Sequence, residues 1–111
     1  DEAKALILEF KELFENENTI KIGQNIKYDL LMLKQYNIQL KGKLFDTMVA
    51  HFLIQPEMRH NMNVLAETYL NYSPISIETL IGKKGKDQMS MRDVPLDDIK
   101  EYAAEDADVT Y

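Results

Sequence analysis

The sequence predicts a small α/β domain that is mostly helical, with one or two short strands. Three observations support this fold class. Apolar residues recur at steps of three and four between residues 3 and 14, which is the spacing of an amphipathic helix. Residues 19–22 alternate in polarity and are rich in β-branched side chains, which favours a short strand. A chain of 111 residues with 45% hydrophobic content suits one compact domain with a modest core.

In the first third of the chain, the ends of the predicted helices and strand follow from residues that interrupt the apolar patterns. The first helix is expected to continue to about Glu15, because residues 16–18 are polar and interrupt the apolar stripe. Gly23 permits a tight turn after the strand. Asn25 is predicted to be the N-cap of a helix from about Ile26 to Tyr36.

The rest of the chain predicts one further strand and several capped helices. A strand is expected at residues 42–45, and Asp46-Thr47 should cap a helix that ends near Gln55, before Pro56. A helix is expected at residues 64–70, with its start at Asn61 or Asn63. A short helical turn from Ser76 to Gly82 and a flexible basic loop at 83–86 should follow. The last helix should start at Pro95, with Asp97 and Asp98 in its first turn.

Composition limits the possible locations and ligands. The chain has no cysteine, so any metal would need oxygen or histidine ligands. No apolar run approaches the ~20 residues that a membrane-spanning helix needs, and the acidic start is unlike a targeting peptide. The protein is therefore expected to be soluble and cytoplasmic.

The net charge of −6 is unevenly distributed along the chain. Residues 1–18 carry two Lys against six acids (−4), residues 97–111 one Lys against six acids (−5), and residues 19–96 ten Lys or Arg against seven acids (+3). Clustered acids repel a phosphate backbone directly but attract Mg²⁺ or Mn²⁺, which can then bind phosphate oxygens. An acidic, solvated surface would produce the same distribution.

Tyr102 and Asp106 stand four residues apart on one face of the last predicted helix. A phenol beside a carboxylate can orient a water molecule next to a metal ion. Asp29 lies at the start of another predicted helix and could supply a second carboxylate. Each residue also has a purely structural interpretation, since such i,i+4 pairs are common and an Asp in a first turn often serves the helix dipole.

Two segments of the chain resemble motifs of a known family. Gly23-Gln24-Asn25-Ile26-Lys27-Tyr28-Asp29 and Tyr102-Ala103-Ala104-Glu105-Asp106-Ala107-Asp108 resemble motifs II and III of the 3′-to-5′ exonuclease domain of bacterial DNA polymerase I (family A), in the tyrosine branch of the four-acid exonucleases. The spacers Phe45-Asp46-Thr47-Met48, Arg59-His60-Asn61-Met62 and Leu65-Ala66-Glu67 are similar too and occur in the same order. The resemblance covers essentially the whole chain and implies a ribonuclease H-like fold.

The resemblance implies a role for eight residues in two-metal phosphodiester hydrolysis. Asp29 and Asp106 would bind two divalent ions, Mg²⁺ or Mn²⁺, and Tyr102 would orient the attacking water. The substrate would be the single-stranded 3′ end of DNA, contacted by Gln24, Asn25, Tyr28, Arg59 and His60. Capping for Asn25 and a solvated loop for Arg59-His60 remain alternative interpretations.

Motif I of this family, an Asp-x-Glu, is missing, because no Asp in the chain has a Glu two positions later. We therefore expect residues 1–111 to be the C-terminal part of the exonuclease domain, without its first three strands and with its last helix incomplete. The parent protein would carry a polymerase domain and proofread. The isolated fragment is expected to be inactive, and surfaces uncovered by the truncation could lead to a homo-oligomer.

Two other functions remain possible at this point. A ribonuclease D-like RNA exonuclease shares both the acids and the tyrosine. The amino acids at 45–47 and 104–110 are more similar to those of the polymerase and favour a DNA substrate. A catalytically silent exonuclease-like module could instead serve only as a scaffold for a polymerase. An upstream strand that bears Asp-x-Glu would favour catalysis over scaffolding.

Overall fold

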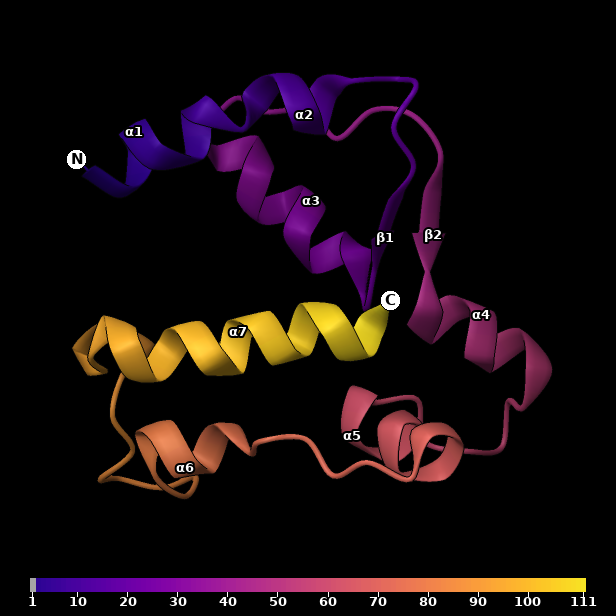
Figure 1. Cartoon of the computed structure of the whole chain (residues 1–111), viewed down its shortest axis with the longest axis vertical. Helices are drawn as coiled ribbons and strands as arrows, with labels where there is room; N and C mark the ends of the chain where they lie inside the picture. The colour runs from indigo at the N-terminus through magenta and orange to yellow at the C-terminus, as the bar shows by residue number, and fades with distance from the viewer. Residues whose placement is uncertain (1) are drawn as a thin grey trace. The chain divides into compact units, whose positions relative to one another are not determined.

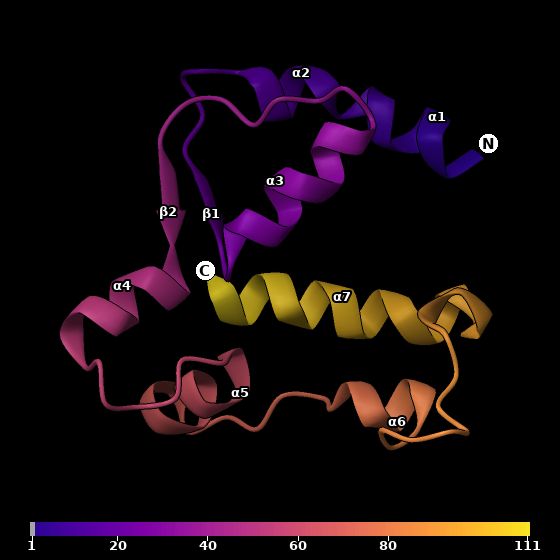
Figure 2. The same cartoon turned by 180° about the vertical axis from the view of Figure 1, so that it is seen from behind.

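The computed structural model describes residues 2–111, and the chain divides into two compact units. The N-terminal unit, Asp1–His60, and the C-terminal unit, Asn61–Tyr111, each have their own elements (Figure 1). The N-terminal unit contains α1 (Glu2–Glu9), α2 (Lys11–Glu15), β1 (Lys21–Gly23), α3 (Ile26–Gln35), β2 (Leu44–Asp46) and α4 (Thr47–Ile54). The C-terminal unit contains α5 (Met62–Leu65), the π-helix η1 (Ala66–Leu70), α6 (Ile77–Ile81), the 3₁₀-helix η2 (Met91–Asp93) and α7 (Leu96–Thr110), seen from behind in Figure 2.

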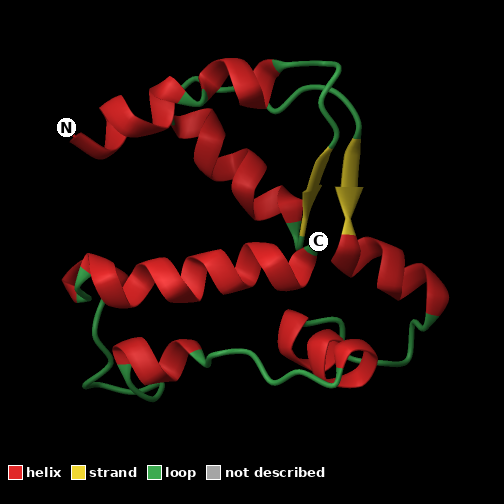
Figure 3. Ribbon diagram, in the orientation of Figure 1, coloured by secondary structure: helices red, strands yellow, loops and turns green. Residues whose placement is uncertain are grey.

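The N-terminal unit is organised around a β-α-β arrangement. β1 and β2 pair in parallel, and α3 lies between them in the chain (Figure 3). The register pairs Lys21 with Leu44 and Gly23 with Asp46, so both strands end at the same level. Ligand sites in parallel sheets commonly form at these carboxyl ends. The register therefore places the start of α3 next to the start of α4. The expected fold class, α/β with short strands and mostly helical, is confirmed.

The first helix is not continuous, and this prediction was wrong. The chain breaks at Phe10, whose backbone angles are φ −90° and ψ 1° and whose N–H donates to the Ile7 carbonyl at 3.2 Å. Leu6, Phe10 and Leu13 are all more than half exposed. Helices of this length depend on tertiary packing, and the apolar stripe here has no continuous core to pack against.

The predicted capping role of Asn25 is also wrong. Its backbone lies in the left-handed region, with φ 59° and ψ 48°, and its side chain accepts no capping hydrogen bond within the described chain. The N–H groups at this end of α3 are bound instead by the carboxylate of Asp46, from the end of β2. A residue 21 positions away thus does what Asn25 was expected to do.

The other predicted helix starts agree with the structure. Asp46 caps α4 by accepting from Met48 N at 2.9 Å, and Asn61 caps α5 by accepting from Val64 N at 2.9 Å. Ser76 caps α6, and α7 follows Pro95 directly. The helix expected at residues 64–70 is mostly a π-helix, and it ends at Asn71, whose φ of 51° is left-handed. The first strand lies at 21–23 rather than 19–22.

Each unit has a small core. Ile26, Leu33 and Ile38 are buried in the N-terminal unit together with His51, and Ala66, Ile81 and Val94 are buried in the C-terminal unit. A two-stranded sheet cannot cover both of its faces, and the apolar side chains of Ile20, Ile22, Leu44 and Phe45 remain 43–59% exposed. None of the helices in the described part of the chain combines the length and apolar character needed to cross a membrane.

Candidate functional site

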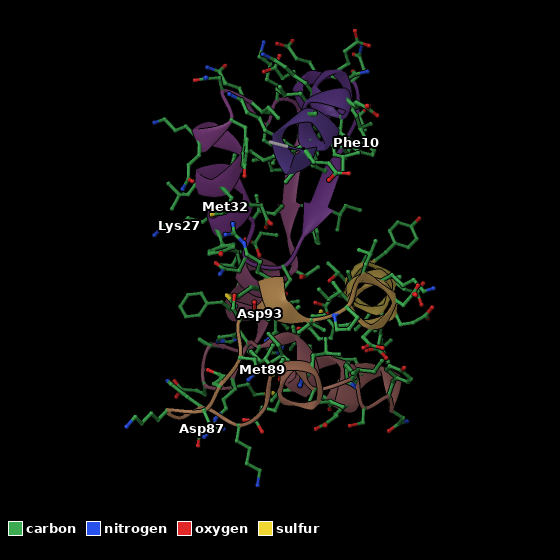
Figure 4. The ribbon with its side chains drawn as sticks, turned by 90° about the vertical axis from the view of Figure 1, so that its left-hand side faces the viewer. Phe10, Lys27, Met32, Asp87, Met89 and Asp93 are labelled. Atoms are coloured by element: carbon green, nitrogen blue, oxygen red, sulfur yellow. The ribbon has the colours of Figure 1, made fainter. Side chains whose placement is uncertain are left out.

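The turn between β1 and α3 presents Asp29. Gly23 ends β1, and a Cβ atom at position 23 would lie only 2.7 Å from Ile26 Cγ1, so a larger residue would push α3 away from the strand. Asn25 in its left-handed conformation then redirects the chain into α3. Asp29 follows in the first turn of α3. Lys27, on the same turn, projects away from the strands (Figure 4).

The Asp29 carboxylate is at the surface of the N-terminal unit, yet its pKa is raised. Partial desolvation is the largest cause, a hydrogen bond from the Asp29 backbone opposes it, and the negative charge of Asp46 adds to it. A second negative charge close to a carboxylate favours a cation beside it. Asp29 is therefore an accessible carboxylate with a second negative charge, that of Asp46, nearby.

Gln24 and His60, two of the five substrate-contact candidates, are engaged within the protein. Gln24 Nε2 donates to the His60 carbonyl at 2.6 Å, and the Thr47 hydroxyl donates to Gln24 Oε1. The Nδ1 atoms of His60 and His51 lie 2.7 Å apart, which requires one imidazole to donate and the other to accept. The Gln24 side chain thus ties the loop before residue 61 to the start of α3. The sequence reasoning missed His51, because a single histidine within an apolar helix carries no local signal.

The side chains of the other three substrate-contact candidates are exposed. Asn25 and Arg59 are exposed, and Tyr28 is 63% exposed on the first turn of α3. Within the N-terminal unit, these residues therefore have accessible polar or aromatic groups for a ligand, whereas Gln24 and His60 hold the backbone that presents them.

The C-terminal unit contains Tyr102 and Asp106 on α7. Both side chains are partly buried, and the Tyr102 hydroxyl donates a hydrogen bond to the Asp106 carboxylate. One carboxylate oxygen of Asp106, Oδ1, is buried and has no hydrogen-bond partner in the described chain. Buried polar atoms in proteins are nearly always bonded, so an unpaired carboxylate oxygen is informative about function.

Desolvation is the main electrostatic influence on this pair. It raises the pKa of Asp106, an effect that the hydrogen bond from Tyr102 opposes and the neighbouring Glu105 charge reinforces. Desolvation also raises the pKa of Tyr102, followed by the charge of Asp106 and the hydrogen bond to it. The Tyr102 phenol is therefore protonated throughout the neutral range.

Glu105, next to Asp106 in sequence, has a structural role. Its Oε2 accepts from Ile75 N at 2.7 Å and its Oε1 accepts from the Tyr72 hydroxyl, which raises the pKa of Tyr72. These bonds hold the segment before α6 against α7. Glu105 is thus occupied, whereas Asp106 has one buried oxygen without a hydrogen-bond partner in the described chain.

A divalent metal fits the donors of this chain only in part. Within residues 2–111, no group of three or more acidic or histidine side chains could hold an ion. Asp29 and the unpaired Oδ1 of Asp106 are suitable oxygen donors, and each belongs to a different unit. Each can supply one ligand of a larger set.

Replacement of Asp106 by asparagine should stabilise the protein at neutral pH. The raised pKa means that the folded state binds the proton more tightly than the unfolded state, so stability from protonation is complete below the unfolded pKa of about 3.9 and is lost as pH rises through the higher folded pKa. Asparagine removes the cost of the desolvated charge. We expect a higher unfolding temperature than wild type at pH 7 and a smaller difference at pH 4, measured by circular dichroism.

The matched control is Asp108→Asn, which removes the same charge from an exposed position on α7. It should shift the unfolding temperature less at pH 7. A lower unfolding temperature for Asp106→Asn than for wild type at pH 7 would show that the charge at position 106 is not a burden to the fold.

The turn after β1, the tyrosine–carboxylate pair on α7 and the order of the elements can be compared with known protein families. The chain matches the 3'-5' exonuclease family over residues 2–111, and it therefore belongs to that family. The resemblance noted from the motifs is confirmed.

The chain is similar to several bacterial DNA polymerase I proteins. The chain is 39% identical to DNA polymerase I of Rhizobium leguminosarum over 101 residues, which is 90% of this chain and 10% of the relative. It is 37% identical to DNA polymerase I of Pseudomonas aeruginosa over 109 residues (96% and 12%) and 34% identical to that of Borreliella burgdorferi over 110 residues (99% and 12%). The chain thus spans about a tenth of the length of these relatives.

Proposed function

We propose that the chain is part of the 3′-to-5′ proofreading exonuclease domain of a DNA polymerase I, and that it hydrolyses the 3′-terminal nucleotides of DNA as part of that longer protein. The observation that carries this proposal is the Tyr102–Asp106 pair on α7, with its buried and unpaired Oδ1. Family membership over residues 2–111 supports it. The names of the relatives favour DNA over the RNA substrate of a ribonuclease D-like enzyme.

Asp29 and Asp106 would hold two divalent ions, Mg²⁺ or Mn²⁺, together with acids outside these 111 residues. Bound ions of this kind activate water and stabilise the charge that develops on the leaving oxygen. Asp106 contributes Oδ1. No hydrogen bond from the described chain has to break before this oxygen binds an ion. Asp29 contributes an accessible carboxylate at the carboxyl ends of β1 and β2.

Tyr102 would orient the attacking water rather than deprotonate it. Its raised pKa keeps the phenol protonated, and its proton is already donated to Asp106. The phenol oxygen keeps lone pairs that can accept a hydrogen bond from water. The same bond to Asp106 fixes the rotation of the carboxylate that holds the ion.

The exposed side chains of Asn25, Tyr28 and Arg59 would contact the single-stranded 3′ end of the substrate. The Arg59 guanidinium can pair with a phosphate, and the Tyr28 ring offers a stacking face for a base. Gln24 and His60 would act indirectly, because their mutual hydrogen bond at 2.6 Å positions the loop that carries Arg59.

The polymerase domain of the same protein would be the permanent partner of this chain. The exposed apolar side chains of β1, β2 and α4, such as Phe45 and Leu53, could pack there or against a second copy of the chain. A scaffold without catalysis is the competing proposal, and the activity of a tyrosine variant separates the two.

Tyr102→Phe in the full-length polymerase should slow 3′-to-5′ degradation of a labelled single-stranded oligonucleotide at least about tenfold. The substitution keeps the ring and removes one hydroxyl, and a hydrogen bond to a charged group contributes about 1.5 to 3 kcal/mol. Single-turnover rates with Mg²⁺ measure the effect, and nucleotide incorporation should be unchanged.

Tyr72→Phe is the matched control, since Tyr72 also donates to a carboxylate on α7, that of Glu105. It should lower stability slightly and leave the degradation rate within about threefold of wild type. Equal losses in both variants would mean that Tyr102 only supports the fold, and no degradation by the wild-type protein would favour the scaffold.

A further inference from the structure

The carboxylate of Asp46 accepts four backbone hydrogen bonds from the starts of two helices. Its Oδ1 accepts from Met48 N at 2.9 Å and Val49 N at 3.3 Å, which caps α4. The same Oδ1 accepts from Asn25 N at 3.0 Å, and Oδ2 accepts from Ile26 N at 2.9 Å. A capping side chain ordinarily serves only the helix that follows it, so the two bonds to the start of α3 need a separate explanation.

The strand register explains how Asp46 reaches α3. Asp46 is paired with Gly23 at the common end of the two parallel strands, so its side chain lies beside the turn that leads into α3. Asn25 adopts a left-handed backbone and does not cap α3 with its own side chain. Without the Asp46 carboxylate, the N–H groups of Asn25 and Ile26 would lose these hydrogen bonds.

We propose that Asp46 is a positioning residue for Asp29, because its carboxylate fixes the start of α3 on which Asp29 stands. This inference deepens the proposed function and rests on it. Asp29 comes three residues after Ile26, within the first turn of α3, so a shift of that start moves the Asp29 carboxylate directly. Asp46 is not itself a candidate ligand, because four N–H groups occupy its oxygens.

Both oxygens of a carboxylate are needed for this double role. A serine at position 46 can still cap α4 through its hydroxyl, as Ser76 does for α6. It has no second oxygen for Ile26 N. Asparagine keeps the size of the side chain but replaces one oxygen by an NH₂ group, which cannot accept from an N–H. Asp46→Ser and Asp46→Asn should therefore release Ile26 N, the N–H group of α3 that Oδ2 binds, while α4 stays capped.

Amide hydrogen exchange of the 111-residue chain, followed by NMR, tests the geometry without any metal or activity. In Asp46→Ser, exchange at Ile26, whose acceptor Oδ2 is lost, should accelerate about tenfold, while exchange at Met48 and Val49 changes less than threefold. Ser76→Ala, which removes the cap of α6, is the matched control and should leave Asn25 and Ile26 unchanged. Unchanged exchange at Ile26 in both Asp46 variants would overturn the proposal.

The metal dependence of exonuclease activity in the full-length polymerase tests the consequence for Asp29. Asp46→Ser should raise the Mn²⁺ concentration for half-maximal degradation at least about fivefold, and saturating Mn²⁺ should restore the rate to within about threefold of wild type. A purely structural defect would lower the maximal rate and leave the Mn²⁺ midpoint unchanged, which would overturn the proposal. Normal degradation by Asp29→Ala would refute the proposed function instead, and hydrogen exchange would still decide whether Asp46 fixes α3.

Discussion

Asp106→Ala in the full-length polymerase is expected to reduce 3′-to-5′ degradation at least ~10³-fold while nucleotide incorporation continues. This factor corresponds to about 4 kcal/mol of transition-state stabilisation. The effect should be large because the substitution removes the unpaired Oδ1, the proposed metal ligand, together with the acceptor that fixes the Tyr102 hydroxyl. Loss of both leaves neither the metal nor the water-orienting group in place.

Single-turnover degradation of a 3′-labelled oligonucleotide, at subsaturating Mg²⁺ and substrate, measures this loss. Asp108→Ala is the matched control, since it removes an exposed carboxylate from the same helix, two residues further along. Its rate should stay within about threefold of wild type. Near-normal degradation by Asp106→Ala would remove Asp106 from the metal site.

The 111-residue chain by itself is expected to show no exonuclease activity. Two-metal sites need several carboxylates to compete with water for Mg²⁺, which demands near-ideal octahedral geometry. Asp46 and Glu105, the acids nearest in sequence or structure to the candidates, are engaged with backbone N–H groups. Asp29 and Asp106 remain, and no larger cluster of ligands exists within residues 2–111.

Purified chain, incubated with a labelled single-stranded oligonucleotide and Mg²⁺ or Mn²⁺, should release no more nucleotide than its Asp106→Ala variant. Calorimetric titration should find at most one ion, bound in the millimolar range. Sustained metal-dependent release by the wild-type chain, absent from the variant, would show that the chain assembles a complete site from other residues.

Local chemistry made much of this structure predictable from sequence. Helix caps depend on side chains that bond N–H groups two or three residues away, so Asp46 for α4, Asn61 for α5 and Ser76 for α6 could be recognised without a fold. The spacing of Tyr102 and Asp106 likewise predicts their contact, because residues four apart share a helical face. Family membership followed from motifs of the same local kind.

Partners that are distant in sequence were decided by the tertiary structure alone. Asp46, and not Asn25, binds the N–H groups at the start of α3, because the two parallel strands end together. Glu105 accepts a hydrogen bond from Ile75 N, 30 residues away. Neither bond has a signature in residue spacing. Desolvation, which raises the pKa of Asp106 and leaves its Oδ1 unpaired, also depends on what packs around the side chain. The sequence by itself thus determined which carboxylates and capping residues the chain carries, and the packing of distant segments decided which of those carboxylates are occupied.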